Sequence, residues 1–203
     1  MDDFTLSARP PLDGYEAAWD GAILREIIDA AIVSIAVPSG GEAELQGALK
    51  TVFGCVQPQP GKSVLSGDGA TRLLGLGPDQ MLAVTSHAPH RAEQALAREL
   101  DGVAYTTNQN DVWVALELAG PQSRVALERI CPIDLHSGSF GQGDVARTQM
   151  EHMGAIIVRT GADTYFLLSA SSSANSFLHA LEVSIDNTST GHHTEKTDMS
   201  PVD

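Results

Sequence analysis

The stretch that decides the fold runs from Val112 to Val183 and reads VWVALELAGPQSRVALERICPIDLHSGSFGQGDVARTQMEHMGAIIVRTGADTYFLLSASSSANSFLHALEV. It begins with apolar residues that alternate from Val112 to Leu118, which predicts a strand. Gly120-Pro121 then opens a helix, because the first helical N–H has no partner and proline is tolerated there. A polar, glycine-rich link follows this helix.

The second part of the stretch predicts three strands and a last helix. Val145–Met150 alternates, and Ala155–Arg159 and Tyr165–Ser169 flank a turn and form a hairpin. Ser171–Ser173 supplies residue types that commonly cap helix N-termini. One apolar face then predicts the helix, formed by Ala174, Phe177, Leu178 and Leu181.

The same order of elements occurs earlier in the chain. A strand at Val33–Val37 and a helix after Gly40-Gly41 precede a hairpin and a second helix; these last elements are Arg72–Leu76, Met81–Thr85 and Pro89–Leu100. Both hairpin turns read Gly-x-Asp, at Gly77 and at Gly161. We interpret the pattern as a duplicated strand–helix–strands–helix unit, which predicts an α+β fold.

This interpretation divides the chain into four parts. Residues 1–20 contain Pro10-Pro11 and few core-type side chains, and are expected to form an extended N-terminal arm. Residues 21–105 are the first half, in which Gly21–Ala31 is either a strand or a short helical turn. Residues 106–186 are the second half. Residues 187–203 hold few apolar side chains and are expected to be a disordered tail.

Composition and charge limit the possible partners. The chain of 203 residues is 42% hydrophobic, enough to bury a core, and its formal charge is −14 from 26 acidic and 12 basic residues. Nucleic acids and anionic membranes are bound mainly through Lys and Arg, so neither partner is expected. The acidic surface is either simply solvated or a docking face for a basic partner.

The N-terminus and the cysteines predict a cytoplasmic protein. The sequence starts Met-Asp-Asp-Phe, without the basic and apolar regions of a signal peptide, and no apolar run reaches transmembrane length. Cys55 and Cys131 each follow the first helix of their half. We expect both to be reduced thiols near the core.

One glycine-rich motif resembles a nucleotide fingerprint. Gly141-Gln142-Gly143-Asp144-Val145-Ala146 matches G-x-G-x-x-A, but that fingerprint must follow a buried strand and open a helix. A Ser/Gly-rich segment precedes the motif here, and a strand pattern follows it. The context therefore argues against nucleotide binding.

The most chemically loaded cluster consists of Arg147, Thr148, Glu151 and His152. Glu151 beside His152 is a possible acid–base pair, but neighbours on a strand point to opposite faces and would not cooperate. No Gly-x-Ser-x-Gly elbow or triad accompanies Ser171–Ser173. We therefore predict no catalytic, cofactor-binding or metal-binding residues, and interpret the cluster as a partner interface.

Several short blocks, read in order, resemble the gamma subunit of heterotetrameric sarcosine oxidase. The resemblance covers residues 11–183. Its more specific blocks are Gly77-Pro78-Asp79-Gln80-Met81-Leu82 and Leu127-Glu128-Arg129-Ile130-Cys131-Pro132-Ile133-Asp134-Leu135, and others are Pro11-Leu12-Asp13-Gly14-Tyr15, Gln109-Asn110-Asp111-Val112-Trp113-Val114 and Ala146-Arg147-Thr148-Gln149-Met150-Glu151-His152-Met153-Gly154.

The resemblance implies a function through a complex. The family's complex demethylates sarcosine oxidatively to glycine, with formation of hydrogen peroxide and 5,10-methylenetetrahydrofolate. The implied partners are the alpha, beta and delta subunits, alpha most directly. FAD, FMN, NAD, tetrahydrofolate and zinc are implied on those other subunits and not on this chain. The implied fold is that of the folate-binding aminomethyltransferase domain of the glycine cleavage system.

Two other functions remain open from the sequence. One is a stand-alone, folate-binding aminomethyltransferase-like protein, although the chain shows no Asp poised beside a folate-cradling set. The other is a gamma-type subunit of a sister complex that acts on another N-methyl amino acid, because substrate contacts would lie on another subunit.

Overall fold

The computed structural model describes residues 9–86 and 91–188 and confirms an α+β fold with two antiparallel sheets. Sheet A has six strands in the order β1-β2-β8-β11-β10-β9, and sheet B has five in the order β4-β5-β6-β3-β7. The strands are β1 Glu16–Trp19, β2 Ala22–Glu26, β3 Ala31–Ala36, β4 Ser63–Leu65, β5 Thr71–Gly75, β6 Gln80–Thr85, β7 Tyr105–Asn108, β8 Trp113–Ala119, β9 Val145–Met150, β10 Met153–Arg159 and β11 Thr164–Ala170. The helices are α1 Glu42–Phe53, α2 Ala92–Glu99, α3 Ser123–Ile130, a 3₁₀ turn at Ser171–Ser173, and α4 Ala174–Asp186.

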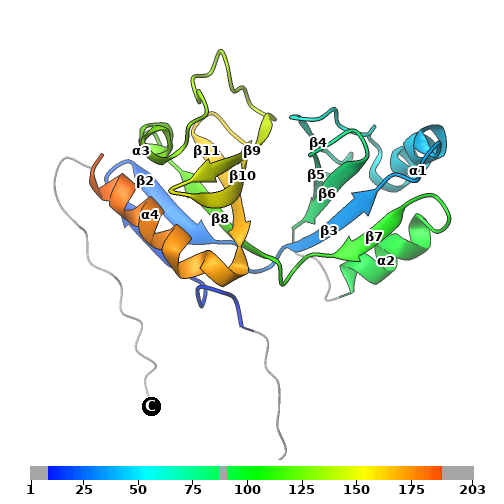
Figure 1. Cartoon of the computed structure of the whole chain (residues 1–203), viewed down its shortest axis with the longest axis horizontal. Helices are drawn as coiled ribbons and strands as arrows, with labels where there is room; N and C mark the ends of the chain where they lie inside the picture. Colours follow the sequence, from blue (N-terminus) through cyan, green and yellow to red (C-terminus); the bar gives the residue numbers. More distant parts are fainter. Residues whose placement is uncertain (1–8, 87–90, 189–203) are drawn as a thin grey trace, which may run out of the picture.

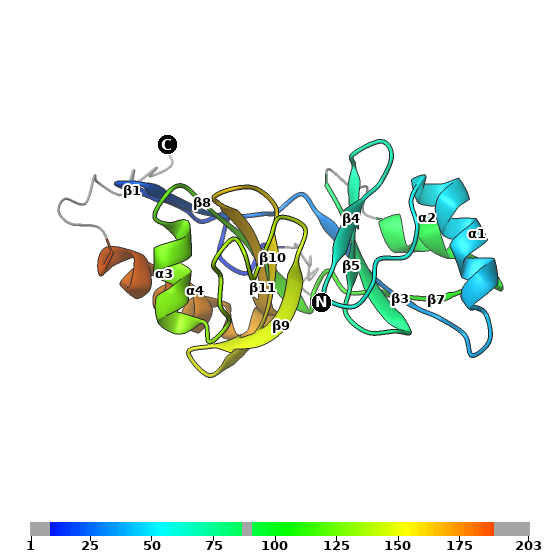
Figure 2. The ribbon, with the colours of Figure 1, turned by 90° about the horizontal axis from the view of Figure 1, so that it is seen from above.

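The two sheets pack face to face between two outer layers of helices (Figures 1 and 2). α3 and α4 cover the outer face of sheet A, where buried residues such as Leu116, Phe177 and Leu181 form one core cluster. α1 and α2 cover sheet B through a second cluster. A third cluster, which we call the seam, joins the facing sides of the two sheets and includes Val84 and Phe166.

The topology confirms the duplication. The order β4-β5-β6-β3-β7 in sheet B matches β9-β10-β11-β8-β2 in sheet A, with the helices in equivalent places. In each of these two orders the last strand, β7 or β2, comes from outside the repeated unit that supplies the other four strands. β2 precedes the first unit but pairs with β8, and β7 precedes the second unit but pairs with β3. The two halves therefore exchange strands reciprocally.

The N-terminal region departs from the expected arm, and at Gly21–Ala31 the strand alternative is confirmed. Glu16–Trp19 is a strand, so the extended arm expected over residues 1–20 does not describe it. Ala22–Glu26 is a strand as well, but it belongs to the sheet of the second half. β1 forms because residues 16–26 make a hairpin, in which Trp19 pairs with Ala22 across the two-residue turn Asp20-Gly21. Residues 1–8 of the expected arm and 189–203 of the expected tail lie outside the described residues.

Hydrogen bonds hold this N-terminal hairpin to the body. The carboxylate of Glu26, which is 8% exposed, accepts the N–H groups of Leu12 and Gly14 at 3.0 and 2.8 Å. The Tyr15 hydroxyl donates to Glu182 on α4 at 2.6 Å. The Glu26 contacts fix the segment before β1 to β2, and the Tyr15 contact ties this segment to α4, 167 residues further along the chain.

Two smaller expectations have different outcomes. Cys55 and Cys131 are free thiols, partly buried and buried respectively, as predicted. The serines do not cap α4: Ser171 Oγ donates to the Asp111 carbonyl and Ser173 Oγ to the Ala170 carbonyl, so both hydroxyls bond carbonyls and not helix N–H groups. Among the described residues, no helix is long and apolar enough to cross a membrane.

Candidate partner interface

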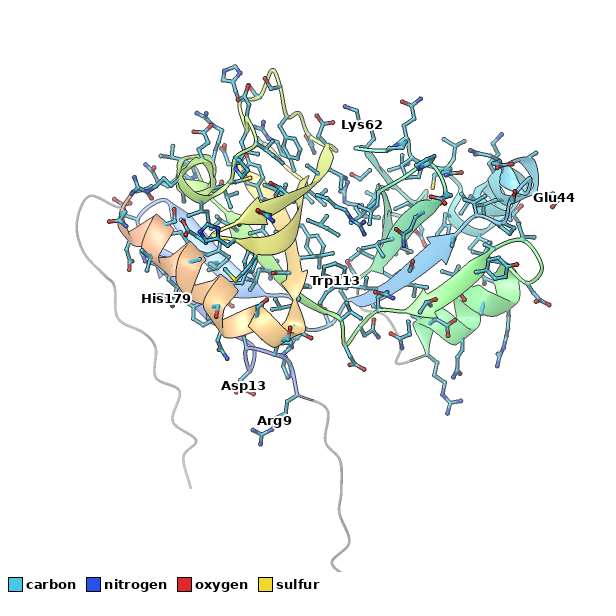
Figure 3. The ribbon with its side chains drawn as sticks, viewed as in Figure 1. Arg9, Asp13, Glu44, Lys62, Trp113 and His179 are labelled. Atoms are coloured by element: carbon cyan, nitrogen blue, oxygen red, sulfur yellow. The ribbon has the colours of Figure 1, made fainter. Side chains whose placement is uncertain are left out.

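β9 lies at one edge of sheet A and is tied to sheet B only at its start. Ser63 N–H donates to the Gly143 carbonyl at 2.7 Å, and Val145 N–H donates to the Gly61 carbonyl at 2.9 Å. An ion pair between Lys62 and Asp144 closes the same rim at 2.5 Å. Figure 3 shows Lys62 at this upper rim, with Trp113 lower down between the two halves.

Beyond Val145 the edge of β9 is open. Met150 pairs with Met153 across a two-residue turn, so hydrogen-bonded and non-hydrogen-bonded pairs alternate from there along the hairpin. Arg147 and Gln149 fall at non-hydrogen-bonded positions, which direct their backbone N–H and C=O groups away from β10. In the part of the chain that the structure describes, no strand lies beyond them. Such an edge can pair with a strand of another chain.

The turn between β9 and β10 consists of Glu151 and His152. Their φ angles are 46° and 70°, in the left-handed region that side-chain-bearing residues rarely adopt. Both are exposed. The expectation that they lie on a strand is therefore wrong. They form a tight turn whose twist suits the hairpin, at a conformational cost of about 1–2 kcal/mol per residue.

A groove of about 540 Å³ lies beside this turn, between α3 and α4. Its walls carry the charged groups Arg129 and Glu151 and the imidazole of His179, and Val183 is 43% exposed within it. The remaining lining side chains are Ile130, Met153, Ser176, Ala180, Ser184 and Asn187. This mixture of apolar and charged lining side chains suits the side chains of a protein partner.

The structure brings together only part of the predicted cluster. Glu151 lines the α3–α4 groove, and His152 is beside it in the turn. Thr148 lies on the face of β9 that is turned towards the helices, because its side chain hydrogen-bonds the Cys131 thiol after α3. Burial raises the pKa of this thiol, and the hydrogen bonds from Ile133 N–H and the Thr148 side chain partly offset the rise. Arg147 lies opposite Ile156 of the seam cluster, and so on the other face.

Sequence reasoning missed the contribution of α4 to this site. Ser176 lies three and four residues before His179 and Ala180, and these lie four and three residues before Val183, so the four share one face of α4; Asn187 follows directly after the helix. That face carries an alanine and an exposed valine next to polar groups. An exposed apolar stripe opposite the buried face was the available signal.

Two further sequence observations concern cofactor and metal binding. The G-x-G-x-x-A motif leads into β9 and opens no helix. Within residues 9–86 and 91–188, no three His, Cys, Asp or Glu side chains gather as a metal site requires. The candidate interface consists of a strand edge, a turn and a groove.

The fold defines the class of protein first. Aminomethyltransferase T of the glycine cleavage system from Bartonella henselae superposes with a TM-score of 0.60 over 86% of this chain and 56% of that chain, at 15% identity. At this identity the likeness concerns the fold alone. The chain therefore has the two-sheet α+β architecture found in that aminomethyltransferase, as the sequence predicted.

The sequence then defines the family. The sarcosine oxidase gamma subunit of an Arthrobacter species is 34% identical over 72% of this chain and 71% of its own length. That of Corynebacterium sp. (strain P-1) is 32% identical over 78% and 77%. The chain belongs to the family of sarcosine oxidase gamma subunits, which confirms the resemblance read from the short blocks.

A solved structure agrees with this assignment. One chain of the heterotetrameric sarcosine oxidase from Corynebacterium sp. U-96, solved in complex with pyrrole 2-carboxylate, superposes with a TM-score of 0.74 at 25% identity. The match covers 88% of this chain and 91% of that one. No model of a known protein family matches the chain.

Proposed function

We propose that this chain is the gamma subunit of a heterotetrameric sarcosine oxidase complex and has a structural role in it. The complex would demethylate sarcosine oxidatively to glycine, with hydrogen peroxide and 5,10-methylenetetrahydrofolate as further products. The flavins, NAD, folate and zinc would be held by other subunits. Family membership and the near-complete overlap with a chain of a heterotetrameric enzyme support this proposal.

The contact surface is proposed to be the open edge of β9 together with the α3–α4 groove, and the alpha subunit is the proposed partner. The observation that carries this surface is the adjacency of three features: outward-directed backbone at Arg147 and Gln149, a strained exposed turn at Glu151-His152, and a groove lined by apolar and charged side chains. Backbone strain is retained mainly at functional sites. An open strand edge is able to pair with a strand of another chain.

Purification of the tagged chain from its native cells tests the proposed function. A yellow assembly that contains three further polypeptides and oxidises sarcosine, with peroxide formation measured, is the expected result. A sister complex would be recognised by oxidation of another N-methyl amino acid in preference to sarcosine. A colourless monomer that binds tetrahydrofolate by calorimetry would contradict the subunit role and favour a stand-alone aminomethyltransferase-like protein.

A further inference from the structure

A second cavity, of about 410 Å³, lies at the seam between the two sheets. Sheet A contributes Arg25, Glu117 and Phe166, and sheet B contributes Arg72 and Val84. It is separate from the α3–α4 groove, which lies on the outer side of sheet A. Its volume is within the range of small-molecule sites.

The charged residues of this cavity occupy positions where packed sheets normally carry apolar side chains. Side chains alternate along a strand, so Arg72 shares a face with Leu74, which is part of the seam cluster. Likewise Glu117 shares a face with Ala115 of the same cluster. Inward-facing positions of stacked sheets form the core between them, and charges there depart from the rule. Such departures concentrate at functional sites.

The cavity wall carries four charged side chains, of which Arg25 and Glu117 pair with each other, leaving Arg72 and Asp29 as the other two. Arg25 and Glu117 form an ion pair at 2.8 Å. The Arg72 side chain, in contrast, donates to the Ser63 hydroxyl at 3.2 Å, which is its one partner in the described part of the chain. Burial lowers the pKa of the Arg72 guanidinium.

Arg159 shows how the same fold treats an arginine with a structural role. It is 8% exposed and donates to the carbonyls of Phe140 and Ala162 at 2.8 and 2.5 Å, and its guanidinium lies 5.8 Å from the centre of the Tyr165 ring. A guanidinium has five N–H donors, and a desolvated one needs partners. Arg159 has them within the protein, whereas the partly buried Arg72 has only the Ser63 hydroxyl among the residues that the structure describes.

We propose that the seam cavity binds a carboxylate attached to an apolar body, with the carboxylate held by Arg72. A guanidinium recognises a carboxylate through two parallel hydrogen bonds. Phe166, Val84 and Leu65 provide apolar walls for the body of the ligand. The carboxylate belongs either to a free small molecule or to a residue of another subunit. This inference goes beyond the proposed function and does not depend on it.

Calorimetric titration of the full chain with benzoate tests the site. Benzoate is expected to bind saturably at one site, and Arg72→Met to weaken binding about tenfold or more, because a charge-assisted hydrogen-bonded pair is lost. Arg72→Lys should retain part of the affinity. The control Arg98→Met removes an exposed arginine of α2 that lies outside both the cavity and the proposed interface, and should leave the binding constant unchanged.

Three results would overturn the proposal. They are no benzoate binding by the folded wild-type chain, equal binding by Arg72→Met, and failure of Arg72→Met to fold, since that failure would give Arg72 a structural role like that of Arg159. The source of the carboxylate is resolved in the assembled complex. Benzoate binding that differs between complexes carrying the wild-type and Arg72→Met chains indicates a free ligand. If Arg72→Met weakens benzoate binding only in the isolated chain and not in the complex, the carboxylate comes from another subunit.

Discussion

Glu26 illustrates how a single carboxylate fixes the N-terminal hairpin. It is 8% exposed and accepts two backbone N–H groups. Glu26→Ala leaves those donors without a partner and is expected to lower the free energy of unfolding by about 1–3 kcal/mol. Urea denaturation measures the change. The control Glu99→Gln, at an exposed position, should stay within about 0.5 kcal/mol of wild type. An equal effect of both variants would show that the Glu26 contacts do not stabilise the fold.

Tyr15 makes stability depend on alkaline pH. Burial, and then the hydrogen bond to Glu182, raise the pKa of Tyr15 above the 10.0 of free tyrosine. The neutral phenol is therefore favoured by folding, so its contribution is present below pH 10 and declines as pH rises further, when the unfolded state loses a proton that the folded state retains. Tyr15→Phe should reduce the loss of stability between pH 9 and about 11 in urea titrations. An unchanged pH slope would contradict this assignment.

The β9–β10 turn allows stability and assembly to be separated. Glu151→Asn with His152→Gly places the residue types that favour left-handed backbone at both positions, and is expected to raise the free energy of unfolding by about 1–2 kcal/mol. If the turn contacts a partner, the same variant should weaken assembly, measured by analytical ultracentrifugation. Asp13→Gly relieves a similar φ of 54° outside the proposed interface and should leave assembly intact. A stabilised variant that assembles normally would exclude the turn from the interface.

Proline substitution tests the open edge of β9. The N–H of Arg147 points away from β10, so Arg147→Pro keeps the internal ladder and blocks pairing with an added strand. We expect the variant to fold and to lose assembly, measured by co-purification of the other subunits. Ala18→Pro is the matched control, because Ala18 holds the equivalent outward position on β1 at the opposite edge of sheet A. Loss of assembly in both variants, or in neither, would contradict a specific role of β9.

The elements show how far sequence patterns reach. Alternation and helical periodicity located both hairpins and all four α-helices, since these signals are local. They could not show which sheet β2 and β7 join, because periodicity defines the buried face of a strand and not its neighbour. Asp20-Gly21 was a usable hairpin signal that was missed. Glu151-His152 was not usable, because neither residue is typical of a turn that requires positive φ at both positions.

The candidate interface was predictable only in part for a similar reason. The cluster Arg147, Thr148, Glu151 and His152 marked the right hairpin, but its members face different sides of sheet A. The α3–α4 groove required the packing of two helices that are distant in sequence, and the position of Arg72 in the seam cavity required knowledge of the opposing sheet. Both depend on tertiary contacts that a single sequence does not encode locally.

Reciprocal strand exchange predicts that the whole molecule unfolds as one unit. Each sheet contains a strand that belongs to the other half of the chain, and the seam cluster joins the two sheets. Trp19 reports on the hairpin and α4, to which its indole donates at 2.6 Å, whereas Trp113 packs against the seam. Urea transitions of the Trp19→Phe and Trp113→Phe variants, followed by fluorescence, should coincide with each other and with the circular dichroism transition. Separate midpoints would mean that the halves unfold independently.

Hydrogen–deuterium exchange of the chain, alone and in the complex from its native cells, tests the proposed assembly role most directly. The account predicts that assembly protects residues 145–153 and the exposed face of α4 more than any other described segment, because added backbone pairing slows amide exchange. The outer faces of α1 and α2 should exchange at similar rates in both states. Protection confined to α1 and α2, with residues 145–153 unchanged, would contradict the β9 edge and the α3–α4 groove as the surface through which this chain joins its partners.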